Sequence, residues 1–121
     1  MAKGLSARDI RLKRAYQPAA ADDGARILVD RLWPRGLKKS DAAIDRWLKD
    51  IAPSTALRKW FAHDPARWPE FRRYAAEIRR HPDQLAELRV LARKGPVTLI
   101  FSARDELRND AVVLRHVLLG R

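Results

Sequence analysis

Two short apolar segments, residues 27–29 and 97–101, constrain the fold of this chain more than any other feature. Both are rich in β-branched residues and carry no charge, which is typical of strands buried on both faces of a sheet. We expect the strands to extend over residues 27–33 and 97–101. More than sixty residues with helical patterning separate them, so the strands should be parallel and joined by a right-handed helical crossover.

Residues 8–16 alternate apolar and basic side chains, with Ile10 and Leu12 on the apolar face. This period of two predicts a half-exposed strand at the edge of the sheet. The lysine and arginines of its exposed face also discourage pairing with other edges, so they have a structural explanation. Residues 17–25 contain a proline, a glycine and two aspartates and are predicted to form a loop.

Five further segments have apolar residues at helical spacing and are bounded by capping residues or prolines. In the first, Ile44, Trp47, Leu48 and Ile51 follow the N-cap Ser40 at positions that share one helix face. The predicted helices run from Ser40 to Pro53, from Ser54 through Phe61, from Asp64 to His81, from Pro82 to Gly95, and from about Asp110 to Gly120. The sequence therefore predicts a small single-domain α/β fold, with a short, mainly parallel sheet, helices packed around it and a helical crossover between the two buried strands.

The composition narrows the class of protein. A chain of 121 residues can bury a core as one domain, and we expect residues 1–7 to be disordered. The absence of cysteine excludes disulfides, thiolate metal ligands and cysteine nucleophiles, and suits a reducing compartment. No apolar segment approaches a membrane span or a signal-peptide core, so a cytoplasmic protein without a membrane partner is expected. The three histidines lack metal-ligand spacing and no Gly-rich phosphate loop is present, so neither a metal nor a cofactor is predicted.

The net charge of +11 raises the expectation of an anionic partner, whether nucleic acid, a phosphorylated metabolite or an acidic protein. The basic residues are spread along the chain and form no tail or block, so the charge also fits a solvated surface.

The sequence Asp-Arg-Leu-Trp-Pro-Arg-Gly at residues 30–36 stands at the carboxyl end of the first predicted strand. In open α/β sheets, ligands bind at the carboxyl ends of the strands. If the two buried strands lie side by side, residues 30–36 are brought next to residues 102–105. The last helix begins just beyond, so its free N–H groups are expected to face the same place. We therefore expect the functional site at this edge.

Arginine side chains dominate the expected site. Arg31, Arg35 and Arg104 should converge there and hold an anion, because a guanidinium presents a planar fork of donors that suits phosphate or carboxylate. Trp33 is placed to stack on a base or ring, or simply to cover the sheet edge. The arginines alternatively pair with aspartates and only tie loops together. The predicted ligand-binding residues are Arg31, Trp33, Arg35, Gly36, Arg104 and Asn109, the last orienting the ligand through side-chain hydrogen bonds.

Asp30, His63 and Asp105 are the candidates for acid–base chemistry. Asp30 ends a buried strand, where a carboxylate must find a partner or undergo a rise in pKa. A raised pKa suits a general acid, whereas a tight pair with an arginine would make Asp30 an orienting element. Asp105 has the same ambiguity after the second strand. His63 titrates near neutral pH on a defined turn, although a lone histidine between helices is more often structural.

Several motifs along the chain match those of a known family. They are ILVDRLWPRG at residues 27–36, WLKDIAPST at 47–55, LRKWF at 57–61, HDP at 63–65, VTL at 97–99, ARD at 103–105 and NDAVVL at 109–114. Through them the chain resembles the YeaO-like family of small uncharacterised bacterial proteins (domain of unknown function 488), from about residue 10 to residue 118. The resemblance implies an α/β fold, but it implies no reaction, cofactor or substrate, because none is established for the family. A histidine often precedes the asparagine of the last motif in this family, and this chain has Arg108 there, so a role for an imidazole does not transfer.

Three functions are open on the sequence alone. The first is an anion-binding domain or enzyme for a phosphorylated or nucleotide-like small molecule, with its site at the carboxyl ends of strands 27–33 and 97–101. The alternative is a nucleic-acid-binding module that uses the Arg31-Trp33-Arg35 turn and the basic edge strand, with Arg8, Arg11, Lys13 and Arg14. The third is a protein-interaction domain, for which an exposed aromatic patch at Trp33 would be the signature.

Overall fold

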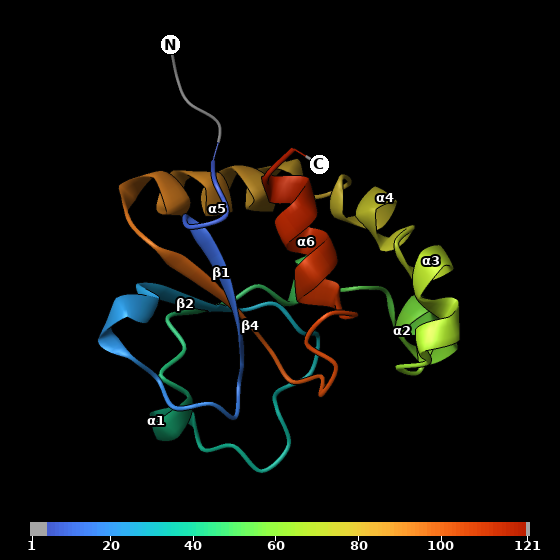
Figure 1. Cartoon of the computed structure of the whole chain (residues 1–121), viewed down its shortest axis with the longest axis horizontal. Helices are drawn as coiled ribbons and strands as arrows, with labels where there is room; N and C mark the ends of the chain where they lie inside the picture. The colour runs from blue at the N-terminus through green and yellow to red at the C-terminus, as the bar shows by residue number, and fades with distance from the viewer. Residues whose placement is uncertain (1–4, 121) are drawn as a thin grey trace.

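Four parallel strands form a sheet in the order β1-β4-β2-β3 (Figure 1). The computed structural model describes residues 5–120 of the chain. The strands are β1 Ile10–Arg14, β2 Ala25–Leu28, β3 Arg46–Trp47 and β4 Val97–Phe101. Every pair of neighbouring strands is parallel. The parallel pairing of β2 with β4 and the edge position of β1 confirm the predicted α/β architecture.

Helices and single 3-10 turns connect these strands. They are η1 Ala21–Asp23, α1 Lys39–Ala42, η2 Lys49–Ile51, α2 Thr55–Phe61, η3 Pro65–Arg67, α3 Trp68–Phe71, α4 Tyr74–Ile78, α5 Pro82–Lys94 and α6 Asp110–Leu118. In Figure 1, α5 and α6 lie close to the strands, whereas α2, α3 and α4 form an arm on the right, which we call the α2–α4 arm (residues 55–78). Within residues 5–120, no helix is long and apolar enough to cross a membrane.

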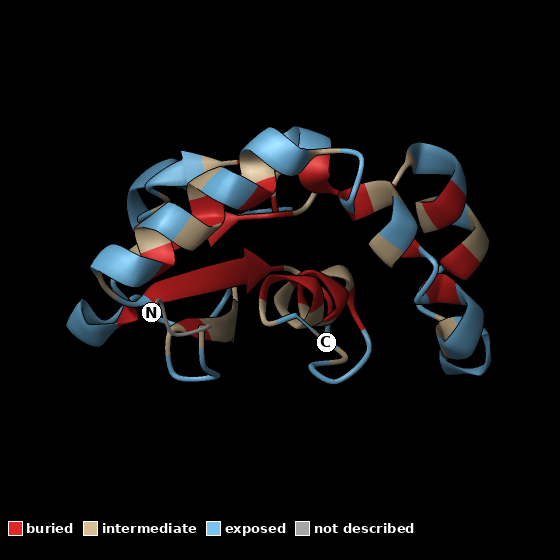
Figure 2. Ribbon diagram, turned by 90° about the horizontal axis from the view of Figure 1, so that it is seen from above, coloured by how far each residue is buried: buried red, intermediate tan, exposed pale blue. Residues whose placement is uncertain are grey.

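Alternating residues of the strands pack into two apolar clusters, one on each face of the sheet. Ile27 and Leu99 belong to the larger cluster, to which α2, α4, α5 and α6 contribute. Leu28 and Ile100 belong to the smaller cluster, which is covered from the loop between β2 and β3 by side chains such as Trp33. Figure 2 shows the buried residues gathered between the strands and the surrounding helices. All five residues of β4 are buried, as expected of a strand covered on both faces.

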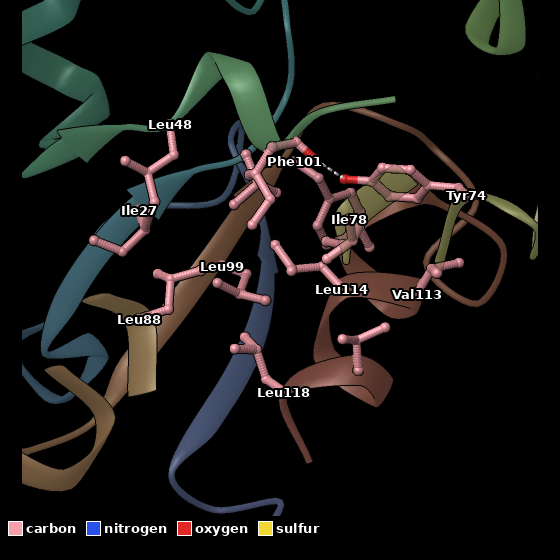
Figure 3. Packing of buried hydrophobic residues seen from close by; sticks show 14 of the residues in the cluster. Ile27, Leu48, Tyr74, Ile78, Leu88, Leu99, Phe101, Val113, Leu114 and Leu118 are labelled. Atoms are coloured by element: carbon pink, nitrogen blue, oxygen red, sulfur yellow. Dashed lines mark hydrogen bonds between the residues drawn. The ribbon is translucent and has the colours of Figure 1, made fainter. Parts of the chain in front are cut away.

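The α2–α4 arm is fixed to the rest of the fold through a buried tyrosine. Tyr74, on α4, has no exposed surface, and its hydroxyl donates a hydrogen bond to the carbonyl oxygen of Ile51 (Figure 3). Its neighbours in the larger cluster include Ile78 and Leu114. The arm and the start of α6 are thereby held in fixed positions around the carboxyl ends of the central strands.

The predicted helix from Ser40 to Pro53 is wrong. The short helix α1 ends at Ala42, because its C-cap Ala43 has a left-handed backbone with φ of 49°. The chain then pairs with β2 as β3 and turns through η2. The apolar residues at helical spacing serve both faces of the sheet instead. Ile44 and Trp47 pack against the smaller cluster, whereas Leu48 and Ile51 belong to the larger one. Helical spacing therefore does not distinguish a helix from an edge segment that contributes to two cores.

Other predicted boundaries also shift. The strand expected over residues 27–33 spans Ala25–Leu28, and the residues after Val29 leave the sheet. The helix expected from Asp64 to His81 is divided into η3, α3 and α4, because Arg72 and Arg73 adopt the tighter backbone of a 3-10 turn, with ψ of −15° and −14°. Residues 1–4 of the segment expected to be disordered lie outside the described residues, whereas Leu5 packs against the larger cluster.

Candidate functional site

A cavity of about 320 Å³ lies at the carboxyl ends of β2 and β4. Its wall comes from residues 30–35 after β2, residues 102 and 103 after β4, the start of α6, and α2 and α3 of the arm. The register of the two strands explains this convergence: Leu28 pairs with Ile100, so the segments that follow them leave the sheet together. The predicted position of the site thus coincides with a concave, partly polar cavity, the usual form of a small-molecule site.

Two carboxyl groups lie against each other in this cavity. The backbone N–H and the hydroxyl of Ser102 donate to Oδ2 of Asp30, at 2.9 and 2.7 Å. The backbone N–H of Ala111 donates to Oδ1 of Asp110, at 2.9 Å. Burial, the nearby charge of Asp30 and a hydrogen bond between the two carboxyl groups raise the pKa of Asp110 well above its ordinary value. The carboxyl group of Asp110 therefore keeps its proton to a higher pH than an ordinary aspartate does.

Three guanidinium groups also contribute to the cavity wall. Arg31 donates from Nε and Nη2 to the carbonyl oxygens of Pro53 and Ala52, at 3.1 and 3.3 Å, which fixes its orientation. Arg58, on α2, has a buried Nε without a hydrogen-bond partner in the described part of the chain. Arg35 is exposed at the mouth. Among residues 5–120, none of the three takes part in an ion pair.

Aromatic side chains complete the wall. Trp33 donates from Nε1 to the carbonyl oxygen of Leu37 at 2.7 Å and meets Trp47 edge to face, with ring centroids 5.5 Å apart. It therefore covers the sheet while one side lines the cavity. His63 also lines the cavity and follows Ala62, and both residues have left-handed backbones, with φ of 57° and 47°. Two consecutive left-handed non-glycine residues are strained, and strain of this kind concentrates at functional sites.

Three of the predicted site residues do not line the cavity. Gly36, Arg104 and Asp105 lie outside the cavity wall. Asp105 accepts hydrogen bonds from the backbone N–H groups of Leu107 and Arg108, and these bonds lower the pKa of its carboxyl group. An acid–base role for Asp105 and an anion-holding role for Arg104 in this cavity are therefore not supported by their positions.

Asn109 reaches the cavity, but its side chain is already engaged. Its Oδ1 accepts from the N–H of Val112 at 3.0 Å, and its Nδ2 donates to the carbonyl oxygen of Asp105 at 2.9 Å. The start of α6 points at the cavity as expected, yet Asn109 and Asp110 already accept hydrogen bonds from its first-turn N–H groups. An anion would therefore be held by arginines and not by the helix terminus.

Sequence reasoning missed Asp110 and Arg58 as members of the site. In the sequence, Asp110 is an ordinary residue for the first turn of a helix. The only sign of a role in the site is its position directly after the loop that follows β4. Arg58 carries no local sequence signal, because its role depends on how the α2–α4 arm folds back over the end of the sheet.

Two basic residues of the edge strand form ion pairs with nearby aspartates. Lys13 pairs with Asp23 at 3.0 Å, and Arg11 lies 3.6 Å from a carboxylate oxygen of Asp22. Arg14 donates to the carbonyl oxygens of residues 102 and 103. Within the described residues, no group of three or more histidine, aspartate or glutamate side chains is placed to hold a metal ion.

Comparison with known proteins places the chain in a family. "Uncharacterized protein YeaO" of Escherichia coli (strain K12) is 49% identical over 107 residues, which cover 88% of this chain and 93% of the relative. An uncharacterized protein of Mycobacterium tuberculosis (strain ATCC 25618 / H37Rv) is 43% identical over 113 residues, which cover 93% and 95% of the two chains. No solved structure shows a significant match. Residues 9–121 match the model of a family described as the inactive DUF488-N3 subclade. The chain therefore belongs to the DUF488 family, within the subclade described as inactive, which confirms the resemblance seen in its motifs.

Proposed function

We propose that the cavity binds a small anionic molecule, phosphorylated or nucleotide-like, and that Arg31, Arg35 and Arg58 supply the positive charge that holds it. The observation that carries this proposal is the buried Nε of Arg58, which lacks an acceptor although its side chain lines the cavity. A buried donor without a partner is destabilising, and the effect is larger for a charged group. An oxyanion seated against Arg58 would supply the missing acceptor through a charge-assisted hydrogen bond.

Arg31 and Arg35 also support the binding of an anion in this cavity. Arg31 is held by two backbone carbonyl oxygens, so its charge is fixed in the wall before a ligand arrives. Preorganised donors lose less conformational entropy on binding than flexible ones. Arg35 adds charge at the mouth, where it can attract an anion from solution.

Binding without turnover is the form of this function that we favour. The matching family is described as an inactive subclade. In addition, Asp105 lies outside the cavity, and His63 is exposed at its wall. The ion pairs of the edge strand favour a small ligand over nucleic acid, because a phosphate backbone at β1 would have to displace Asp22 and Asp23 from their basic partners.

The proposal is tested by thermal denaturation of the purified protein with inorganic phosphate, AMP and a short single-stranded oligonucleotide, each at matched ionic strength. A ligand at about a hundred times its Kd adds about 2.7 kcal/mol to the free energy of unfolding, which raises the Tm by several degrees. Arg58→Ala should abolish the shift. Arg79→Ala, which removes one exposed positive charge outside the cavity, should retain it. Failure of every small anion to stabilise the protein, or equal shifts in the two variants, would overturn the proposal, and a salt-sensitive shift with the oligonucleotide alone would favour nucleic acid.

A further inference from the structure

We propose that the ligand of this cavity is a phosphorylated sugar, free or as part of a nucleotide, whose adjacent hydroxyl groups bind the Asp30–Asp110 carboxyl pair while its phosphate binds the arginines. This inference rests on the proposed function and names the class of ligand. It starts from two groups of side chains in one cavity, which we call the two poles: the carboxyl pair, and the guanidinium groups of Arg31, Arg35 and Arg58. Among the described residues, no ion pair joins one pole to the other.

The scaffold engages only one oxygen of each carboxyl group. Oδ2 of Asp30 accepts from Ser102, and Oδ1 of Asp110 accepts from the N–H of Ala111. Beyond these bonds, the contact between the carboxyl groups and the backbone N–H of Asp110 itself, the described residues donate no hydrogen bond to either carboxyl group. A carboxylate oxygen has two acceptor sites, so the pair retains acceptor capacity on neighbouring atoms. The raised pKa of Asp110 favours the protonated form of its carboxyl group, and that form can donate a hydrogen bond.

Two hydroxyl groups on adjacent carbon atoms match this arrangement. Each hydroxyl donates one hydrogen bond and accepts others, so a diol can donate to the free carboxyl oxygens and accept a hydrogen bond from a protonated carboxyl group. In dinucleotide-binding α/β folds, an acidic side chain likewise forms a hydrogen bond with a ribose hydroxyl.

Other ligand types fit the two poles less well. A bare anion against the carboxyl pair would bring like charges together in a poorly solvated site, which is unfavourable. A divalent cation would meet the carboxyl groups of Asp30 and Asp110, but the described residues include no group of three acidic or histidine side chains placed to hold a metal ion. A simple amine would leave the arginines without an acceptor. A molecule with hydroxyl groups at one end and a phosphate at the other satisfies both poles, and a cavity of about 320 Å³ suits a small ligand.

The test compares ligands that differ in a single hydroxyl group. Calorimetric titration would measure the Kd of ribose 5-phosphate against 2-deoxyribose 5-phosphate, and of AMP against 2′-deoxy-AMP, with inorganic phosphate as a reference. Loss of a hydrogen bond to a charged group is expected to weaken binding about tenfold or more. A preference within the first pair supports a free sugar phosphate, and a preference confined to the second pair supports a nucleotide.

Variants then assign the preference to the carboxyl pair. Asp110→Ala should bring the two Kd values of the preferred pair close together, and Asp110→Asn, which replaces one acceptor by a donor and keeps the side-chain size, should do so in part. Asp83→Ala, which removes an exposed carboxylate in the first turn of α5, should keep the full preference. Equal affinities for the ribose and deoxyribose compounds in the unmodified protein, with phosphate still bound, would overturn this inference alone. Absence of binding by every compound would overturn the proposed function as well.

Discussion

Replacing Asp110 by asparagine should flatten the dependence of folding stability on pH. The pKa of Asp110 in the folded protein lies well above the ordinary value of 3.8, chiefly because the group is buried and lies beside Asp30. Between these two values, the folded protein holds a proton that the unfolded chain has released. The free energy of unfolding therefore falls as pH rises through this window, and it becomes constant above the folded-state pKa.

The size of the effect follows from the linkage relation. One proton held only by the folded state gives a slope of up to about 1.4 kcal/mol per pH unit within the window. Asparagine has nearly the same shape as protonated aspartic acid, and it can still donate a hydrogen bond to Asp30, but it does not titrate. In Asp110→Asn this part of the slope should disappear, so the variant should gain stability over the unmodified protein as pH rises.

The assay is urea denaturation at intervals from about pH 4 to about pH 8. Asp105→Asn is the matched control. The lowered pKa of Asp105 means that its contribution to stability is already present above the ordinary carboxyl pKa and is lost only as pH falls further. Its profile should therefore run parallel to that of the unmodified protein. Parallel profiles for Asp110→Asn and the unmodified protein would refute the raised pKa of Asp110.

Three further substitutions test the scaffold by urea denaturation. Gly24→Ala should cost well over about 1 kcal/mol, because φ is 65° and the added Cβ would lie 2.1 Å from the carbonyl oxygen of Pro96; a neutral result would contradict this close approach. Asp23→Ala should cost about 3–5 kcal/mol, because it leaves the buried Arg26 without its 2.6 Å partner; a loss below about 1 kcal/mol would show that water reaches that guanidinium. Ser54→Ala should cost about 1 kcal/mol by removing the N-cap of α2, and an unchanged midpoint would mean that the cap contributes nothing.

The core strands could be predicted because their sequence patterns are typical of one structure, a strand buried on both faces. Residues 97–101 carry no charge and are mostly β-branched or apolar, and the structure buries all five in β4. Residues 44–51 have no such unique meaning. Ile44 and Ile51 fit one face of a helix in the sequence, yet they pack on opposite faces of the sheet. The periodicity describes only the spacing of apolar residues along the chain. It does not say whether these residues pack into one apolar cluster or into two.

The candidate site was predictable to the extent that strand order determines it. Parallel pairing of β2 with β4 brings Asp30 beside Ser102, and their hydrogen bonds at 2.7 and 2.9 Å bear out the expected juxtaposition of the two strand ends. The partner of Asp30 was not predictable, because an aspartate beside many arginines is expected to form an ion pair, and here its carboxyl group meets that of Asp110. Arg58 depends on the path of the α2–α4 arm, which no local pattern specifies.

The position of Asp110 brings two electrostatic rules into conflict. An aspartate in the first turn of a helix is stabilised in its charged form by the helix dipole, and α6 has its first turn at this residue. Burial beside Asp30 favours the neutral form instead, and it prevails. The same cavity contains guanidinium groups that would relieve this conflict by pairing with the carboxyl groups, yet among residues 5–120 they do not. Keeping the carboxyl pair and the arginines unpaired in one cavity lowers the stability of the fold at that cavity. Such a local loss of stability is expected where a bound ligand completes the interactions.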